Sequence, residues 1–512
     1  MVYLSHWPLL RLPFFWDEAG YYIPAALDFF QTGSLIPHST LTNAHPPLPS
    51  VFLAGWWHLS GYVISGTRTF ICMFAAGALL GVFRLARLLA GDAVAAVVTL
   101  LTAIYPVWFA QSTLAHADIF AAAFTLWGLS FYCERFAAKV APAAKQGAHA
   151  ALAAFFFSLA ALSKETAIVT PVVLGAWEAV LLLTERKKAS SSASLAWLLA
   201  LSAPVVPLAG WYGYHFHETG FAFGNPEFLR YNATANLSPT RVLISLWHRV
   251  LHLTVHMNLY VPVIATLAIL GMPRLQGRAS LVTRQPAFTV LAIILAGNAL
   301  AFSVLGGALL TRYLLPLYPL VLLVCVALWQ ERLRAWWGLA LLTGAGFLAA
   351  LWINPPYAFA PEDNLTYRDM IVLHQQAIRI IEHRYPEATV LTAWPASTEL
   401  EHPLLGYVSH PIKIVAIDNF SLAQVQRAAA DPGAYDTALL FSTKWVPSGG
   451  SLNLGRANEA TDRRLYDFHR DLSPYEAAAL LHGNVAWQAR RGAEWVAVLR
   501  FPRSNQASLL KR

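Results

Sequence analysis

The chain has 512 residues, of which 57% are apolar and only 12% are charged, whereas a soluble domain carries about 25% charged residues. This balance excludes an ordinary soluble enzyme and predicts an α-helical polytopic membrane protein with a soluble appendix. The net charge of +8 does not indicate a nucleic-acid partner, because the basic residues lie in short loops between apolar runs. All three cysteines fall inside apolar runs, so they predict neither a disulfide framework nor a metal site.

Two adjacent carboxylates, Asp17 and Glu18, stand near the start of the chain, directly after an aromatic cluster. The pair alone is typical of a solvated helix start, where the helix dipole favours negative charge. Residues 1–15 are too short and too broken by proline to span a bilayer, which takes about 20 residues. Further along, His45 and two prolines open the apolar run 47–64. This run fits either a short span or a helix lying in the membrane interface, and we favour the interfacial helix.

Clearer membrane spans are predicted from the apolar runs that follow. They are expected at about 68–89, 92–110, 117–133, 149–163, 166–184, 194–213, 256–273, 286–306, 312–329 and 335–353. Together with the run 47–64 they give about 10–11 spans. We therefore predict a membrane domain over residues 1–353, with residues 12–67 as its first external loop.

The basic residues fall on every second loop between these spans. Because cytoplasmic loops carry the excess of Lys and Arg, we assign these loops to the cytoplasm and the alternate loops to the outside. Asp17 and Glu18 are then external only if the run 47–64 does not cross the membrane, and this requires a span ahead of residue 1. We therefore expect either that translation starts upstream or that residues 1–15 are the stub of a lost first span.

From about residue 354 the composition shifts to that of a soluble domain. Short apolar runs predict strands, with amphipathic helical patterns between them. The strands are expected at 389–393, 412–417, 437–441 and 495–501, and the helices at 365–384, 421–430 and 473–482. Because strands alternate with helices, residues 354–512 are predicted to form an external soluble α/β domain.

Several ionisable side chains lie at span ends on the predicted external side. They are Asp17 with Glu18, Asp118, Lys164 with Glu165, and Arg312. Each has a plain structural explanation: a helix-start charge, a local Lys–Glu pair, or an arginine that snorkels to the interface. Together they fit one chemistry, in which a carboxylate takes the proton of a hydroxyl or holds a divalent metal. Lys164 and Arg312 can hold a phosphate leaving group, so the set predicts glycosyl transfer from a lipid-phosphate sugar.

The same residues resemble those of a known family. Trp16-Asp17-Glu18, His45-Pro46-Pro47-Leu48, Ala117-Asp118, Leu162-Ser163-Lys164 and Arg312-Tyr313-Leu314-Leu315-Pro316 occur in this order. This ordered set, within residues 12–330, is similar to the type C glycosyltransferases. Its nearest branch is the superfamily of dolichyl-phosphate-mannose protein mannosyltransferases and lipid A aminoarabinose transferases. The resemblance implies the type C glycosyltransferase fold for the membrane domain.

The resemblance also implies roles for individual residues. The catalytic set is Asp17, Glu18 and Asp118, and the substrate-binding set is His45, Lys164, Arg312 and Tyr313. The implied donor is a polyprenyl-phosphate sugar, a hexose or a pentose, transferred with inversion to an acceptor lipid, glycan or protein. Membrane lipids are further partners, and a divalent metal stays an open option for the carboxylates. The expected location is the cell inner (plasma) membrane, with the C-terminal domain in the periplasm.

Two other functions stay open on the sequence. An O-antigen ligase or polymerase also has many spans and external basic residues, but it usually carries its functional residues in a large late external loop. In this chain the paired carboxylates come first. A membrane transporter places ionisable groups near mid-membrane, and Glu178, inside the predicted span 166–184, keeps that alternative open.

Overall fold

The computed structural model describes residues 1–40, 42, 45–136, 143–184, 191–224, 237–278, 286–305, 309–447, 459–466 and 469–501. The chain forms two compact units. The helical unit comprises Met1–Trp7, Ala25–Gly61 and Thr67–Asn354, and the C-terminal unit comprises Pro8–Pro24, Tyr62–Gly66 and Pro355–Arg512. The chain passes from the helical unit to the C-terminal unit between Asn354 and Pro355, and the division into a membrane domain and an external domain stays a prediction. Residues 8–24 and 62–66 differ from expectation, because they pack with the C-terminal unit instead of the membrane domain.

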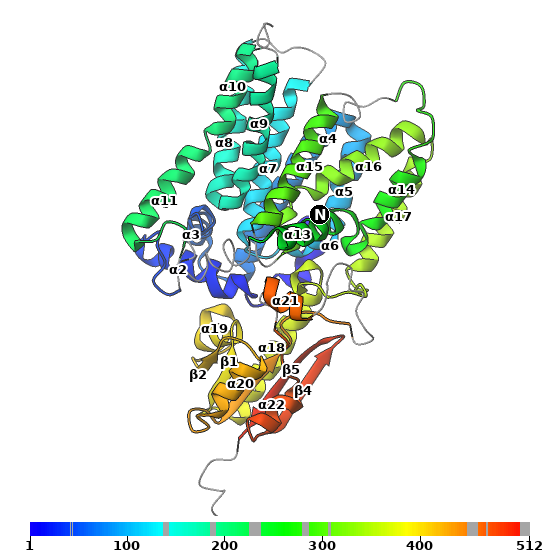
Figure 1. Cartoon of the computed structure of the whole chain (residues 1–512). Coiled ribbons are helices and arrows are strands. Elements are labelled where there is room, and N and C mark those ends of the chain that lie inside the picture. The colour runs from blue at the N-terminus through cyan, green and yellow to red at the C-terminus, as the bar shows by residue number, and fades with distance from the viewer. Residues whose placement is uncertain are drawn as a thin grey trace, which may run out of the picture. The chain divides into compact units, whose positions relative to one another are not determined.

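The described part of the helical unit is built from helices (Figure 1). Its α-helices are α1 (Val2–His6), α2 (Ile23–Thr32), α3 (Leu48–Ser60), α4 (Ile64–Ala90), α5 (Asp92–Ile104), α6 (Pro106–Gln111), α7 (Ala117–Tyr132), α8 (Ala143–Ser163), α9 (Val169–Thr184), α10 (Ser191–Ser202), α11 (Val205–Thr219), α13 (Pro239–Thr254), α14 (Tyr260–Ile269), α15 (Ala287–Val304), α16 (Tyr318–Arg332) and α17 (Trp336–Ala350). Short 3₁₀ turns include η4 (Glu165–Ile168) and η8 (Thr311–Leu314). Neighbouring helices pack directly, as α7 does with α8 and α9 with α10.

Every predicted span contains at least one of these helices, so the multi-span helical fold is confirmed. Within the described residues, five helical segments are long and apolar enough to cross a membrane, or six if the bent segment formed by α13 and α14 is one span. The other helices are shorter: α7 has 16 residues, which at 1.5 Å per residue reach about 24 Å of a hydrocarbon core of about 30 Å. The count of 10–11 spans therefore stays a prediction. The 13 residues of α3 reach only about 20 Å, and its place in the membrane interface stays a prediction.

Proline sets several helix starts around the site. Pro106 opens α6 directly after α5, and Pro239 opens α13, where the Ser238 side chain accepts a hydrogen bond from the Arg241 backbone N–H. Pro319 lies in the first turn of α16, which follows η8. Proline suits these positions because the first backbone N–H groups of a helix have no partner within it.

The C-terminal unit contains a five-stranded mixed sheet in the order β2-β1-β3-β5-β4. The strands are β1 (Thr389–Ala393), β2 (Lys413–Ile417), β3 (Thr437–Phe441), β4 (Asn484–Arg491) and β5 (Glu494–Arg500), and the helices are α18 (Thr366–Arg384), α19 (Ala396–Glu401), α20 (Leu422–Ala429), α21 (Glu459–Tyr466) and α22 (Pro474–Leu480). β1 is parallel to β2 and β3, whereas β5 is antiparallel to β3 and β4. The predicted α/β domain is confirmed. The edge strand β4 was missed because its apolar run is only three residues long, Val485–Trp487, and polar residues follow it.

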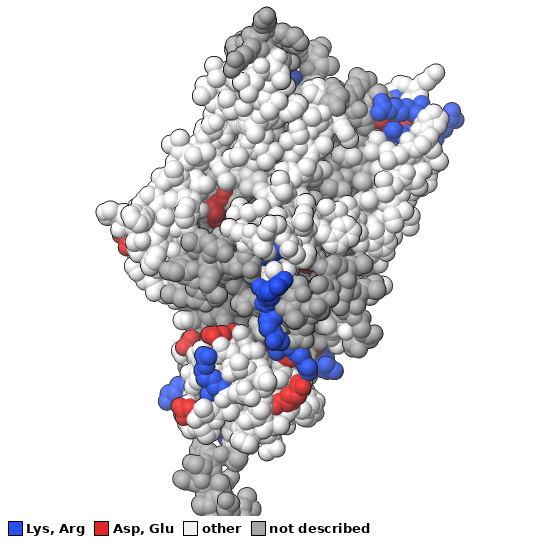
Figure 2. Space-filling view, viewed as in Figure 1, with Lys and Arg blue, Asp and Glu red and all other residues white. Residues whose placement is uncertain are grey.

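Charged side chains are few on the visible face of the helical unit and more frequent on that of the C-terminal unit (Figure 2). Where described side chains of the helical unit are visible, most are uncharged, and basic side chains gather at one end of it (Figure 2). At the C-terminal end of α16, Arg274 and Arg332 lie 3.4 and 3.7 Å from the buried carboxylate of Glu331. The visible face of the C-terminal unit carries charges of both signs, as a solvated surface does.

Candidate functional site

Three charged side chains meet inside the helical unit. Asp118 lies in the first turn of α7, where the helix dipole favours a negative charge. Lys164 is the extended residue between α8 and η4, and Arg312 belongs to η8. Because each residue lies at a break between helices, side chains from three distant parts of the chain can converge without interrupting a helix.

The three side chains form a buried ion cluster. The Lys164 Nζ lies 2.6 Å from Asp118 Oδ1, and the Arg312 Nε lies 3.3 Å from Asp118 Oδ2. Their residues are only 3–5% exposed. Two cations around one carboxylate leave one net positive charge in a region of low dielectric constant, where an anion is strongly attracted.

Tyr313 extends this cluster toward a further cation. The Lys164 Nζ lies 4.0 Å from the centroid of the Tyr313 ring, and the guanidinium carbon of Arg249 lies 5.8 Å from it. Arg249 is fully buried and donates hydrogen bonds to the carbonyl oxygens of Phe302 and Leu310, at 3.2 and 2.8 Å. Arg249 was not among the predicted site residues. Its signal was the four-residue spacing of the buried face of α13, which is Arg241, Ser245, Arg249 and Leu253.

Arg68 and His116 lie next to the same cluster. The Arg68 Nη1 donates to the carbonyl oxygen of Thr113 at 2.7 Å, and His116 directly precedes α7. Burial, and then the positive charges of Arg312, Lys164 and Arg68, hold the pKa of His116 well below its usual value. A neutral imidazole beside the cations is the expected result. Neither residue was predicted as part of the site, although Arg68 begins the predicted span 68–89 and His116 directly precedes the predicted span 117–133.

His45 and Glu165 form a neighbouring pair within the helical unit. The His45 Nδ1 lies 2.9 Å from Glu165 Oε2, and both side chains are partly exposed. The expected local pair between Lys164 and Glu165 is therefore wrong, since each has a longer-range partner. The His45 contact ties the loop before α3 to the turn that carries Lys164, because Glu165 is the next residue.

The paired carboxylates Asp17 and Glu18 belong to the C-terminal unit. Glu18 is fully buried, and its Oε2 accepts a hydrogen bond from the Phe15 backbone N–H at 2.8 Å. Asp17 is half-buried and precedes a π-helical turn, η2 (Glu18–Tyr22); such turns frequently mark functional sites. Burial, and then the charge of Glu18, raises the pKa of Tyr62. The two adjacent carboxylates therefore differ in environment: Glu18 stabilises the turn, and Asp17 stays accessible.

Glu178, which kept the transporter alternative open, is paired with neighbouring side chains. Glu178 lies on α9 with its side chain fully buried, and it forms an ion pair with Arg135. Its Oε1 also accepts a hydrogen bond from the Tyr132 hydroxyl at 2.6 Å. An acid that is paired in this way stabilises helix packing at the end of α7 and does not by itself indicate a transport pathway.

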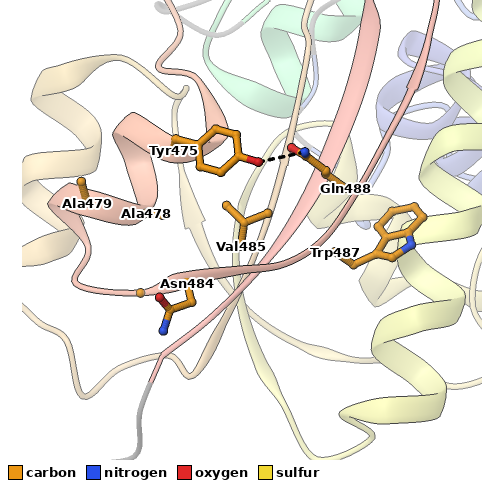
Figure 3. Close-up of a pocket in the computed structure, with 8 residues that line it drawn as sticks. Tyr475, Ala478, Ala479, Asn484, Val485, Trp487 and Gln488 are labelled. Atoms are coloured by element: carbon orange, nitrogen blue, oxygen red, sulfur yellow. Dashed lines mark hydrogen bonds between the residues drawn. The ribbon is translucent and has the colours of Figure 1, made fainter.

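Within the described residues, no group of three or more His, Cys, Asp or Glu side chains is placed to hold a metal ion. A divalent metal at the carboxylates therefore stays a prediction without an assigned ligand set. A cavity of about 550 Å³ lies in the C-terminal unit, between α22 and the edge strand β4 (Figure 3). Tyr475 and Gln488 contribute to its lining and are hydrogen-bonded at 3.0 Å. Its lining contains no charged side chain, so it lacks groups for acid–base or phosphate chemistry.

Comparison with known proteins defines the class. Residues 44–211 match the model of a family described as dolichyl-phosphate-mannose-protein mannosyltransferase; this segment includes His45, Asp118 and Lys164. The chain is similar to ArnT from Cupriavidus metallidurans bound to undecaprenyl phosphate, with 14% identity, 97% of this chain and 96% of that chain covered, and a TM-score of 0.57. The apo state of that ArnT gives 14% identity, the same coverage and a TM-score of 0.56.

An oligosaccharyltransferase from Archaeoglobus fulgidus, in complex with Zn and sulfate, is 13% identical over 84% of this chain and 64% of that chain, with a TM-score of 0.46. No curated protein matches the chain. The similarity to ArnT extends over nearly the whole chain. The protein is thus a multi-span membrane protein with the type C glycosyltransferase fold, and the resemblance found in the motifs is confirmed.

Proposed function

We propose that the protein is an integral membrane glycosyltransferase that moves a sugar from a polyprenyl-phosphate donor to an acceptor hydroxyl on the external side of the membrane. The observation that carries this proposal is the buried cluster of Asp118, Lys164 and Arg312, with Arg249 across the Tyr313 ring. Because the buried cations outnumber the carboxylate, the cluster can bind an anionic group. A guanidinium group binds phosphate bidentately. The bound undecaprenyl phosphate of ArnT, which shares the fold, supports a lipid phosphate as that group.

In this proposal the cation cluster binds the donor phosphate. Lys164, Arg249 and Arg312 stabilise the negative charge that grows on the phosphate as the bond to the sugar breaks. Asp118 orients Lys164 and Arg312, whose positions its two oxygens fix. His45 holds the turn of Lys164 through Glu165. Tyr313 supplies an aromatic face that both flanking cations contact.

Asp17 is the proposed general base. It takes the proton of the acceptor hydroxyl while that oxygen attacks the anomeric carbon from the side opposite the phosphate. The bond between the anomeric carbon and the phosphate oxygen breaks, and the lipid phosphate leaves with the electron pair. The sugar is transferred with inversion. Glu18, which is buried and bonded to the Phe15 N–H, maintains the turn and takes no proton.

The test is an in vitro assay with the purified full chain, a panel of undecaprenyl-phosphate hexoses and pentoses as donors, and a detergent extract of cell-envelope lipids and proteins as the source of acceptor hydroxyls. Released undecaprenyl phosphate is measured. We expect release from at least one donor. Arg312→Lys keeps the charge but loses the planar fork, and should raise the donor KM by about tenfold. Arg84→Lys is the matched control, because Arg84 contacts Ser130 and Glu134, at 2.6 Å each, and belongs to a separate ion pair. Release from none of the donors, or an equal effect of both substitutions, would contradict the proposal.

A further inference from the structure

The turn that carries Asp17 is packed against one tryptophan of the C-terminal unit. The Trp394 ring lies 5.1 Å from Trp16, nearly perpendicular to it, and 5.7 Å from Tyr21. Gly20 faces the same indole: a Cβ at this position would lie only 2.4 Å from Trp394 Nε1. Gly20 therefore allows the indole to approach the backbone of the turn.

The residues after Trp394 hold the flanks of the same turn. The Phe14 backbone N–H donates to the carbonyl oxygen of Leu405 at 3.1 Å, and the Tyr62 hydroxyl donates to that of Leu404 at 2.7 Å. Residues 394–405 thus contact two segments that are far apart in the sequence, one around Asp17 and one at Tyr62. This is the physical reason that residues 8–24 and 62–66 fold with the C-terminal unit.

The segment beginning at Trp394 is itself anchored to the core of the C-terminal unit. Glu399 on α19, which starts two residues after Trp394, lies 2.7 Å from His374 Nδ1 on α18. Both residues are buried, at 1% and 2% exposure. This buried contact ties α19 to α18, two residues after Trp394.

The turn needs such a support, because its backbone is strained. Trp16 has φ of +48°, a left-handed conformation that is unusual for a bulky residue. The next residues form the π-helical turn of η2. Conformations of this kind persist only where the surrounding structure holds them, and they concentrate at functional sites.

We infer that Trp394 is a positioning residue for glycosyl transfer: by packing on Trp16, Gly20 and Tyr21 it holds the strained turn that presents Asp17. The C-terminal unit then contributes to catalysis without touching the reacting atoms. This inference rests on the proposed role of Asp17 as the base. It predicts an effect on turnover and not on donor binding, because the groups that bind phosphate belong to the helical unit.

The first experiment compares steady-state kinetics of purified full-length variants. Trp394→Ala should lower kcat by about 10–100-fold, as expected for a misplaced catalytic group, with the donor KM changed less than about twofold. Trp394→Phe should recover most of kcat, since it restores an aromatic face. Gly20→Ala keeps the Trp394 side chain but pushes its ring away from the turn. It should reproduce the loss, and it covers the case in which Trp394→Ala does not fold. Trp487→Ala is the matched control and should keep wild-type kcat, because Trp487 lies on the edge strand β4, which β3 and β5 separate from β1.

The second experiment measures the order of the turn without using activity. In an Asp17→Cys background, the rate of maleimide labelling should rise about tenfold on adding Trp394→Ala, which corresponds to about 1.4 kcal/mol of opening. The three native cysteines are buried and give a low background. Faster labelling with unchanged kcat of the Asp17 enzyme would contradict Asp17 as the base, and so the proposed mechanism. Unchanged labelling, with or without a loss of kcat, would overturn the positioning role of Trp394 alone.

Discussion

Replacement of Asp118 by asparagine tests the buried ion cluster most severely. The substitution keeps the size of the side chain but removes the carboxylate that contacts Lys164 at 2.6 Å and Arg312 at 3.3 Å. Coulomb's law at an effective dielectric constant of about 20 gives gross attractions of about 6 and about 5 kcal/mol for these two contacts. The loss of buried solvation offsets part of this attraction. Removing one partner of a buried pair costs about 3–5 kcal/mol, because the remaining charges stay buried.

The assay is reversible unfolding of the purified protein in mixed detergent–SDS micelles. Asp118→Asn should lower the free energy of unfolding of the helical unit by about 3–5 kcal/mol. Asp92→Asn is the matched control in the same unit. Its partner is Arg87 at 2.8 Å, and the two side chains are 77% and 63% exposed, so it should change stability by less than about 1 kcal/mol. Equal effects of the two substitutions would refute the argument that the Asp118 cluster is buried and charged.

Three further predictions follow from the site and the fold. Asp17→Asn should reduce transfer by about 10²–10⁴-fold while the protein stays folded; a variant that keeps most of the wild-type rate at saturating donor would remove Asp17 as the base. Burial, partly offset by the Ser442 hydroxyl, raises the pKa of Glu494 from 4.5 to about 7, so the folded state binds more protons than the unfolded state between these values. The contribution of Glu494 to the stability of the C-terminal unit should therefore be greatest below about pH 4.5 and fall as the pH rises through 7. Glu494→Gln should remove this pH dependence in a series of thermal unfolding measurements. An unchanged pH dependence would contradict the prediction. Cysteines introduced into residues 354–501 should react with an impermeant reagent on intact spheroplasts, and reaction only after permeabilisation would reverse the proposed topology.

The sequence predicted the helical unit and part of its site because those features have local signals. Apolar runs mark the helices, and a charge at the end of an apolar run is conspicuous, which is how Asp118, Lys164 and Arg312 were found. The structure brings these three together. Arg249 was missed because α13 carries several basic residues, and its buried face is recognised only from the four-residue spacing that ends at Leu253.

Long-range packing in the C-terminal unit could not be predicted in the same way. The contacts of Trp394 with Trp16 and Gly20 join residues separated by most of the chain, and no periodicity in either segment records them. The π-helical turn after Asp17 was likewise hidden, because its residues are compatible with an ordinary helix start. The partner of Glu165 could not be predicted for a different reason. Its neighbour in the sequence, Lys164, suggested a local pair, whereas its ion-pair partner in the structure is His45.

The central claim is that the cations around Asp118 hold a lipid phosphate. The most direct measurement is mass spectrometry of the lipids that co-purify with the full chain, compared with those of a variant in which Arg249 and Arg312 are both replaced by glutamine. We predict a polyprenyl phosphate, with or without its sugar, on the wild-type protein, and its loss from the double variant but not from Arg84→Gln. A polyprenyl phosphate retained equally by all three proteins, or found on none of them, would contradict the claim.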